Sequence, residues 1–84
     1  MKRHIAFNSR TYTIILEPAD EGGFVVRVPA LPEVVTEGDT EAEALAMAKD
    51  AIELVLASRA ERGEPIPTET GQPLIHQVTV AVAA

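Results

Sequence analysis

The segment Gly38-Asp39-Thr40-Glu41-Ala42-Glu43-Ala44-Leu45 contains a strong signal for the start of a helix. Thr40 and Glu43 have the spacing of a capping box, in which the hydroxyl accepts a hydrogen bond from one free backbone amide and the carboxylate accepts one from another. Residues 41–62 continue with a helical pattern of apolar side chains. Gly63 is the expected left-handed cap, and the proline two positions later prevents continuation. These signals predict one long helix over residues 41–62.

The predicted helix carries apolar residues on two opposite sides. One stripe is expected to face the core and consists of Leu45, Ala48, Ile52, Val55 and Leu56. With Leu45 at 0° and a step of about 100° per residue, Met47 lies at about 200° and Leu54 at about 180°, so both should be exposed. The carboxylates around this pair are Glu43, Asp50 and Glu61. An apolar pair ringed by carboxylates is typical of a protein interface, although scattered surface hydrophobes on a long helix give the same pattern.

An antiparallel sheet is predicted from three segments rich in β-forming residues, which are Tyr12–Glu17, Phe24–Val28 and Val34–Glu37. Side chains alternate between the two faces of a strand. One face of the first two strands is expected to pack on the core and carries Tyr12, Ile14, Leu16, Phe24, Val26 and Val28. The opposite face includes Ile15 and Val25 and is too apolar for a surface in contact with water alone, so we expect something to cover it.

Two further segments extend this pattern. Leu74–Val82 reads as a final strand, with Val78, Val80 and Val82 on one side. His4–Phe7 is a short apolar stretch and a candidate for an extra N-terminal strand. The chain is therefore predicted to be a single α+β domain over residues 1–84, in the order β-β-β-α-β, with one long helix packed on an antiparallel sheet.

The charge of the chain limits its partners. Thirteen acidic residues against seven basic ones give a formal net charge of −6, which repels phosphate backbones and disfavours direct binding of nucleic acid. The same field would attract a basic protein, although charge that only maintains solubility explains the composition equally well. The sequence has no signal-peptide pattern and no apolar run of about 18 residues, so we expect no membrane association and a cytoplasmic location.

Side chains suited to catalysis or metal binding are sparse. The sequence has no cysteine and only two histidines, His4 and His76, neither of which has local metal-ligand spacing. Neither Ser9 nor Ser58 lies in a nucleophile elbow. We therefore expect no catalytic, cofactor-binding or metal-binding site, and the residues predicted to have a binding role are the five on the outer side of the helix.

Two segments that flank the helix motif complete a resemblance to a known family. Val28-Pro29-Ala30-Leu31-Pro32 precedes the motif, and Gly63-Glu64-Pro65-Ile66-Pro67 follows it at helix length. Together with parts of residues 12–26 they resemble the signature of HicB-like antitoxin domains. In that family a strand ends in a Pro-x-Leu-Pro turn, a Gly-Asp-Thr step opens a helix rich in alanine and leucine, and a Gly-x-Pro-x-Pro segment closes it.

The resemblance implies a non-catalytic inhibitor that binds a small basic HicA-like mRNA interferase toxin and blocks its RNA-cleaving surface. Family members are described as resembling part of a ribonuclease H-like fold, in which carboxylates hold divalent metals. Glu17, Asp20 and Asp50 could therefore be cast as ligands in a metal-dependent nuclease. Asp20 belongs to a turn and Asp50 points away from the predicted core stripe, so these three are not expected to converge on a metal.

Many members of this family also carry a C-terminal DNA-binding segment, which we expect to be missing here because the given sequence stops one predicted strand after Gly63-Glu64-Pro65-Ile66-Pro67. The alternative to an antitoxin is a solitary HicB-like module without a toxin, acting as a homo-oligomeric scaffold or binding module. In either case we expect a homodimer or a higher even oligomer. One helix can cover only one face of a sheet, and an edge strand remains open.

Overall fold

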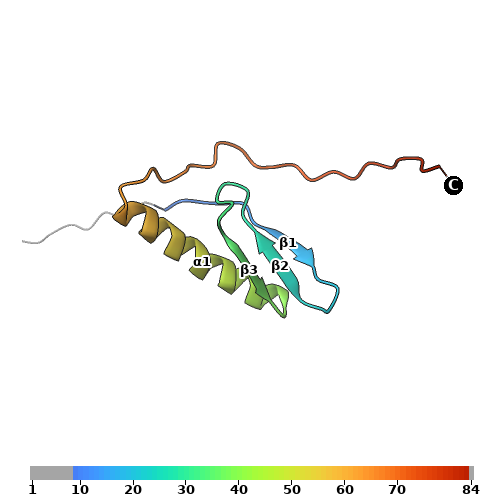
Figure 1. Ribbon diagram of the computed structural model, residues 1–84, viewed down its shortest axis with the longest axis horizontal. Helices are drawn as coiled ribbons and strands as arrows, with labels where there is room; N and C mark the ends of the chain where they lie inside the picture. Colours follow the sequence, from blue (N-terminus) through green and yellow to red (C-terminus); the bar gives the residue numbers. More distant parts are fainter. Residues whose placement is uncertain (1–8, 84) are drawn as a thin grey trace, which may run out of the picture.

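The computed structural model describes residues 9–83, in which a three-stranded antiparallel sheet is covered on one face by a long helix (Figure 1). The strands are β1 (Ile15–Pro18), β2 (Phe24–Arg27) and β3 (Val35–Gly38), and the helix is α1 (Glu41–Glu61). This α+β arrangement confirms the predicted order of three strands and one helix. The candidate N-terminal strand at His4–Phe7 lies outside the described residues. At 21 residues α1 is long enough for a membrane span but not apolar enough, and no other described helix qualifies.

The sheet has the order β1-β2-β3, so β2 is central and the other two strands are edges. Leu16 lies opposite Val26, and Val26 lies opposite Thr36. This row is on the face toward α1, where Val26 is fully buried. The buried core consists of Val26, Val28, Leu31, Val34, Ala44 and Ala48, with Tyr12, Ile14, Leu16 and Phe24 packed against it. The alternation along the first two strands therefore predicted the core face correctly.

The segment Val28-Pro29-Ala30-Leu31-Pro32 leaves the sheet as a loop that returns to the core. The amide of Leu31 donates a hydrogen bond to the carbonyl of Val28 at 3.0 Å, and the amide of Val34 donates to the carbonyl of Leu31 at 2.9 Å. The side chain of Leu31 has no exposed surface. The loop is thus held by one buried leucine and two short-range hydrogen bonds.

Both ends of α1 are capped where the sequence predicts, but of the two predicted capping-box bonds the described residues show the one to Thr40 and not the one to the Glu43 carboxylate. The hydroxyl of Thr40 accepts a hydrogen bond from the amide of Glu43 at 3.1 Å, which is the first of the two bonds of a capping box. Gly63 has a φ of 68°, and its amide donates to the carbonyl of Ala60 at 3.1 Å. The next amide donates to the carbonyl of Arg59 at 2.9 Å. This pair of bonds is the Schellman motif, which a left-handed glycine makes accessible.

The buried side of α1 differs from the predicted stripe. Leu45 is 46% exposed, whereas Ala44 and Ala48 are buried. The prediction that Leu45 belongs to the core is therefore wrong for the single chain, although Ile52, Val55 and Leu56 pack against the core as expected. The cause is the close approach of α1 to the end of β3, since a Cβ on Gly38 would lie 2.4 Å from the amide nitrogen of Ala44. Only small side chains fit at that contact.

Residues 70–83 form an extended segment, here named the C-terminal arm, which is exposed throughout and belongs to no strand (Figure 1). The predicted final strand at Leu74–Val82 is therefore wrong for the single chain. Just before the arm, the amide of Thr13 donates a hydrogen bond to the carboxylate of Glu69 at 3.0 Å, and the hydroxyl of Tyr12 donates to the carbonyl of Pro67. Beyond these contacts the arm pairs with no other strand in the part of the chain that the structure describes, and an unpaired segment makes no sheet.

Candidate functional site

The outer face of α1 carries the five residues selected from the sequence, which are Glu43, Met47, Asp50, Leu54 and Glu61. Leu54 is 72% exposed and Met47 is 41% exposed, so both point away from the core as predicted. The three carboxylates are exposed as well. Met47 is the less exposed of the apolar pair because the buried side is centred on Ala44 and Ala48, which lie closer to Met47 around the helix than Leu45 does.

The carboxylates of this outer face are available to a partner. Within residues 9–83, no hydrogen bond or ion pair engages the side chains of Glu43, Asp50 or Glu61. The nearby pair of Lys49 and Glu53, with 4.0 Å between the charged atoms, is highly exposed and contributes little to stability. The outer face therefore combines an exposed leucine with uncompensated negative charge.

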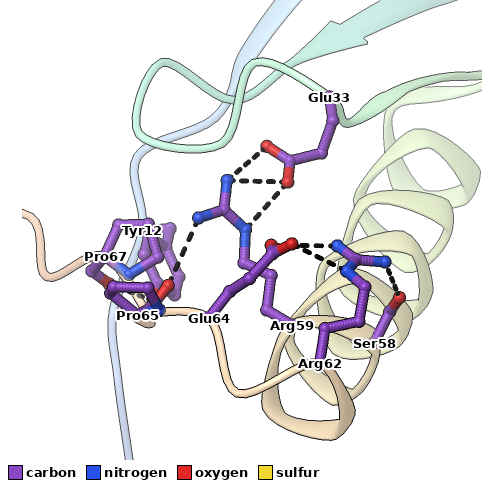
Figure 2. A network of polar contacts seen from close by, with 8 residues as sticks. All are labelled: Tyr12, Glu33, Ser58, Arg59, Arg62, Glu64, Pro65 and Pro67. Carbon is purple, nitrogen blue, oxygen red and sulfur yellow. Dashed lines mark hydrogen bonds and ion pairs between the residues drawn. The ribbon is translucent and has the colours of Figure 1, made fainter.

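A separate network of polar contacts fixes the C-terminal end of α1 (Figure 2). Arg59 forms a two-pronged ion pair with Glu33, in which Nε and Nη2 each donate to a carboxylate oxygen at 2.8 Å. Its Nη1 donates to the carbonyl of Pro65 at 3.3 Å. The Arg59 side chain is only 20% exposed. One guanidinium therefore joins the loop before β3, the helix and the segment that follows it.

A second arginine completes this network. Arg62 donates from Nε to Glu64 at 2.9 Å and from Nη1 to the hydroxyl of Ser58 at 2.6 Å (Figure 2). Hydrogen bonding from its own backbone and from Arg59 lowers the pKa of Glu33, and the hydrogen bond from Arg62 lowers the pKa of Glu64. Both carboxylates are therefore charged and paired at neutral pH, which suits a structural role.

A groove of about 730 Å³ runs between the segment before β1 and one flank of α1. Its apolar lining consists of Tyr12, Ile14, Leu45, Ala48, Ile52, Leu56 and Ile66. The groove exists because α1 packs against β3 and β2, which leaves its flank near the segment before β1 uncovered by the other described residues. The sequence does not reveal this groove, because a helical apolar pattern does not distinguish a core residue from one that lines an open groove.

The carboxylates considered for a metal-dependent nuclease are not brought together. Glu17 accepts a hydrogen bond from Nε of Arg27 at 2.8 Å, Asp20 lies in the turn after β1, and Asp50 lies on the outer face of α1. Across residues 9–83, no three histidine, aspartate or glutamate side chains gather in a group that could hold a metal ion. The described residues therefore offer no support for that chemistry.

Fold and charge place this chain among small acidic α+β domains, and comparison with known proteins gives the family. The family described as "HicB_like antitoxin of bacterial toxin-antitoxin system" matches residues 12–79, which is most of the chain. The chain belongs to this family.

Individual relatives agree with the assignment. Antitoxin HicB 1 of Photorhabdus laumondii is 42% identical over 84 residues, covering 98% of this chain and 53% of the relative. Antitoxin HicB of Escherichia coli is 43% identical over 56 residues, covering 67% of this chain and 41% of the relative. A UPF0150 protein of Thermoplasma acidophilum is 39% identical over 61 residues, covering 73% of this chain and 88% of the relative. The chain thus spans about half the length of the named antitoxins that it matches.

Proposed function

We propose that this chain is an antitoxin that binds a small basic HicA-like mRNA interferase and occludes its RNA-cleaving surface. Family membership and the names of two relatives support the antitoxin role. The observation that supports the outer face of α1 as the docking site is Leu54, which is 72% exposed among carboxylates that make no ion pair within the described residues. The proposed binding residues are Glu43, Met47, Asp50, Leu54 and Glu61.

The proposed mechanism is binding and occlusion, without catalysis, metal or cofactor. A protein that cleaves RNA presents basic side chains to phosphates, and the carboxylates on α1 offer the same side chains a competing partner. Leu54 and Met47 supply an apolar centre from which water is excluded, and such centres account for most of the binding energy of an interface. The complex would form in the cytoplasm, where mRNA is available.

RNA cleavage by the protein encoded in the adjacent reading frame tests this proposal. Leu54→Lys places a charge in the apolar centre and should weaken inhibition about tenfold or more, because an unpaired charge is costly to bury. Asp50→Lys should mainly slow association and reduce its salt dependence. Val35→Lys is the matched control, since Val35 is 63% exposed and lies on the sheet face away from α1. Equal inhibition by folded Leu54→Lys and the unmodified chain would contradict the proposal.

One observation favours a second candidate function. The Thermoplasma relative is named a UPF0150 protein rather than an antitoxin, and the aligned region covers 88% of it. A solitary HicB-like module would act as a homo-oligomeric scaffold or binding module without a toxin. The adjacent reading frame discriminates between the two functions, since a short basic histidine-containing sequence there supports the antitoxin and its absence supports the solitary module. A homodimer or higher even oligomer is proposed in both cases.

A further inference from the structure

The C-terminal arm carries five large apolar side chains that are almost completely exposed. Leu74, Ile75, Val78, Val80 and Val82 have 71–85% of their surface in contact with solvent. Residues 70–83 contain no aspartate, glutamate, lysine or arginine. A contiguous apolar segment of this kind marks an interaction site, and an extended backbone with unpaired amides and carbonyls recruits another strand.

A matching surface lies at the edge of the sheet formed by β1. Among residues 9–83, this strand pairs only with β2, so its other side has no strand partner in that part of the chain. The apolar groove adjoins the start of this strand, where Tyr12 and Ile14 line it opposite α1. Leu45 in this groove is 46% exposed. A fourth strand placed against β1 would hydrogen-bond to that edge and direct every second side chain into the groove.

In the same chain, the arm lies too far along β1 to fill this groove. Glu69 is fixed beside Thr13 by two hydrogen bonds, of 3.0 Å and 2.9 Å. From there the arm runs in the same direction as β1 and continues past the turn that follows it (Figure 1). If residue 69 lies beside residue 13, residue 74 comes level with Pro18, the last residue of β1. Residues 75–82 then extend about 26 Å farther, at about 3.3 Å per residue.

We propose that residues 74–82 of one copy add as a strand to the β1 edge of a second copy, with Val78, Val80 and Val82 packed in that copy's groove. The second copy returns its own arm in the same way. The result is a two-fold symmetric dimer in which each arm completes the sheet of its partner. This proposal concerns the assembly of the chain and goes beyond its proposed antitoxin function.

The charge of the arm and the surface area that it would bury favour a second copy of this chain, rather than a basic protein, as the acceptor of the arm. The arm is uncharged within a chain of net charge −6, so it offers no attraction to a basic partner, and its insertion adds no repulsion between two copies. Each of its five apolar side chains exposes about 100 Å² of apolar surface. Three such side chains on each of two arms, together with the surface that they cover, bury on the order of 1,200 Å², which exceeds the roughly 1,000 Å² of a specific interface.

Disulfide trapping tests the exchange, because the chain has no cysteine of its own. A Leu45→Cys variant is mixed with single-cysteine variants at positions 78–82 and oxidised. Crosslinks between the two chains are expected with V78C, V80C or V82C and not with T79C or A81C, whose side chains point to the opposite side of the strand. Crosslinking of Leu54→Cys instead of Leu45→Cys to V80C would place the arm on the outer helix face and overturn the proposal.

The mass in solution provides an independent measurement. Sedimentation of the unmodified chain should give twice the 9.0 kDa of one chain at micromolar concentration. Val80→Lys should raise the dissociation constant of the dimer by about tenfold or more, because it places a charge in the apolar groove, and Thr79→Lys should leave it nearly unchanged. Val80 is exposed in the single chain, so the substitution does not threaten the fold. A monomeric unmodified chain, or equal effects of the two substitutions, would overturn the proposal.

Discussion

Gly38 is the residue at which the sheet and the helix are closest. A Cβ there would lie 2.4 Å from the amide nitrogen and 2.6 Å from the Cα of Ala44, and both contacts are with backbone that cannot rotate away. Because β3 leads directly into α1, relief of this overlap requires one element to move relative to the other. Glycine is needed at position 38 for its small size and not for its backbone conformation, because the glycines with positive φ are Gly22, Gly23 and Gly63.

Gly38→Ala is therefore expected to lower the free energy of unfolding by about 1–3 kcal/mol, as overpacking does in a well-packed core. Gly71→Ala is the matched control, because a Cβ at Gly71 meets nothing within 4 Å. Urea denaturation of both variants measures the difference. Equal stability of the two variants would show that α1 and β3 are not in tight contact at Gly38.

Ion pairs hold the C-terminal end of α1. Arg59 pairs there with Glu33, whose pKa is lowered by hydrogen bonding from its own backbone and from Arg59. A carboxyl group whose pKa is lower in the folded state stabilises the fold at pH values above its ordinary pKa. That stabilisation is lost as the pH falls from the ordinary value of 4.5 through the lower folded-state value.

Glu33→Gln should consequently flatten the fall in unfolding free energy below about pH 4.5, while lowering stability at pH 7. Glu61→Gln serves as the comparison, because the Glu61 side chain has no ion pair within the described residues. Chemical denaturation at a series of pH values from 7 to 3 provides the measurement. The same pH profile for Glu33→Gln and the unmodified chain would mean that the ion pair is not formed in solution.

The elements were predictable because their signals are local. Alternating side chains marked the strands, and Thr40 and Gly63 marked the ends of the helix to within one residue. The first strand begins at Ile15 rather than Tyr12, since the preceding residues contact Pro67 and Glu69 instead of β2. That contact joins positions more than 50 residues apart, and no local pattern indicates it.

The outer face of α1 was predictable in part. The helical period placed Leu54 and Met47 away from the core, and the structure confirms their exposure. The pairing of Arg59 with Glu33 was not predictable, because the two positions are separated by 26 residues and a helix dipole explains a C-terminal arginine equally well. The helical period also predicted that Leu45 is buried in the core. A fourth strand added beside β1 would bury it.

At the scale of the whole molecule, net charge governs the choice of partner. With a formal charge of −6, this 84-residue chain should show no sequence-specific binding to the DNA upstream of its own reading frame. A gel shift at physiological salt provides the test. A specific complex with a dissociation constant below about a micromolar would contradict this expectation, since non-specific binders have values near or above it.

The proposed antitoxin function requires a basic toxin to dock on the outer face of α1. Methyl NMR tests it most directly, because the chain has only two methionines and the Met47 methyl group is readily assigned. On titration with the protein encoded in the adjacent reading frame, the methyl resonances of Met47 and Leu54 should shift at stoichiometric toxin. Those of Leu74 and Val82 in the arm should not. Shifts confined to the arm or to the groove residues Leu45 and Ile52, with Met47 and Leu54 unchanged, would contradict the claim.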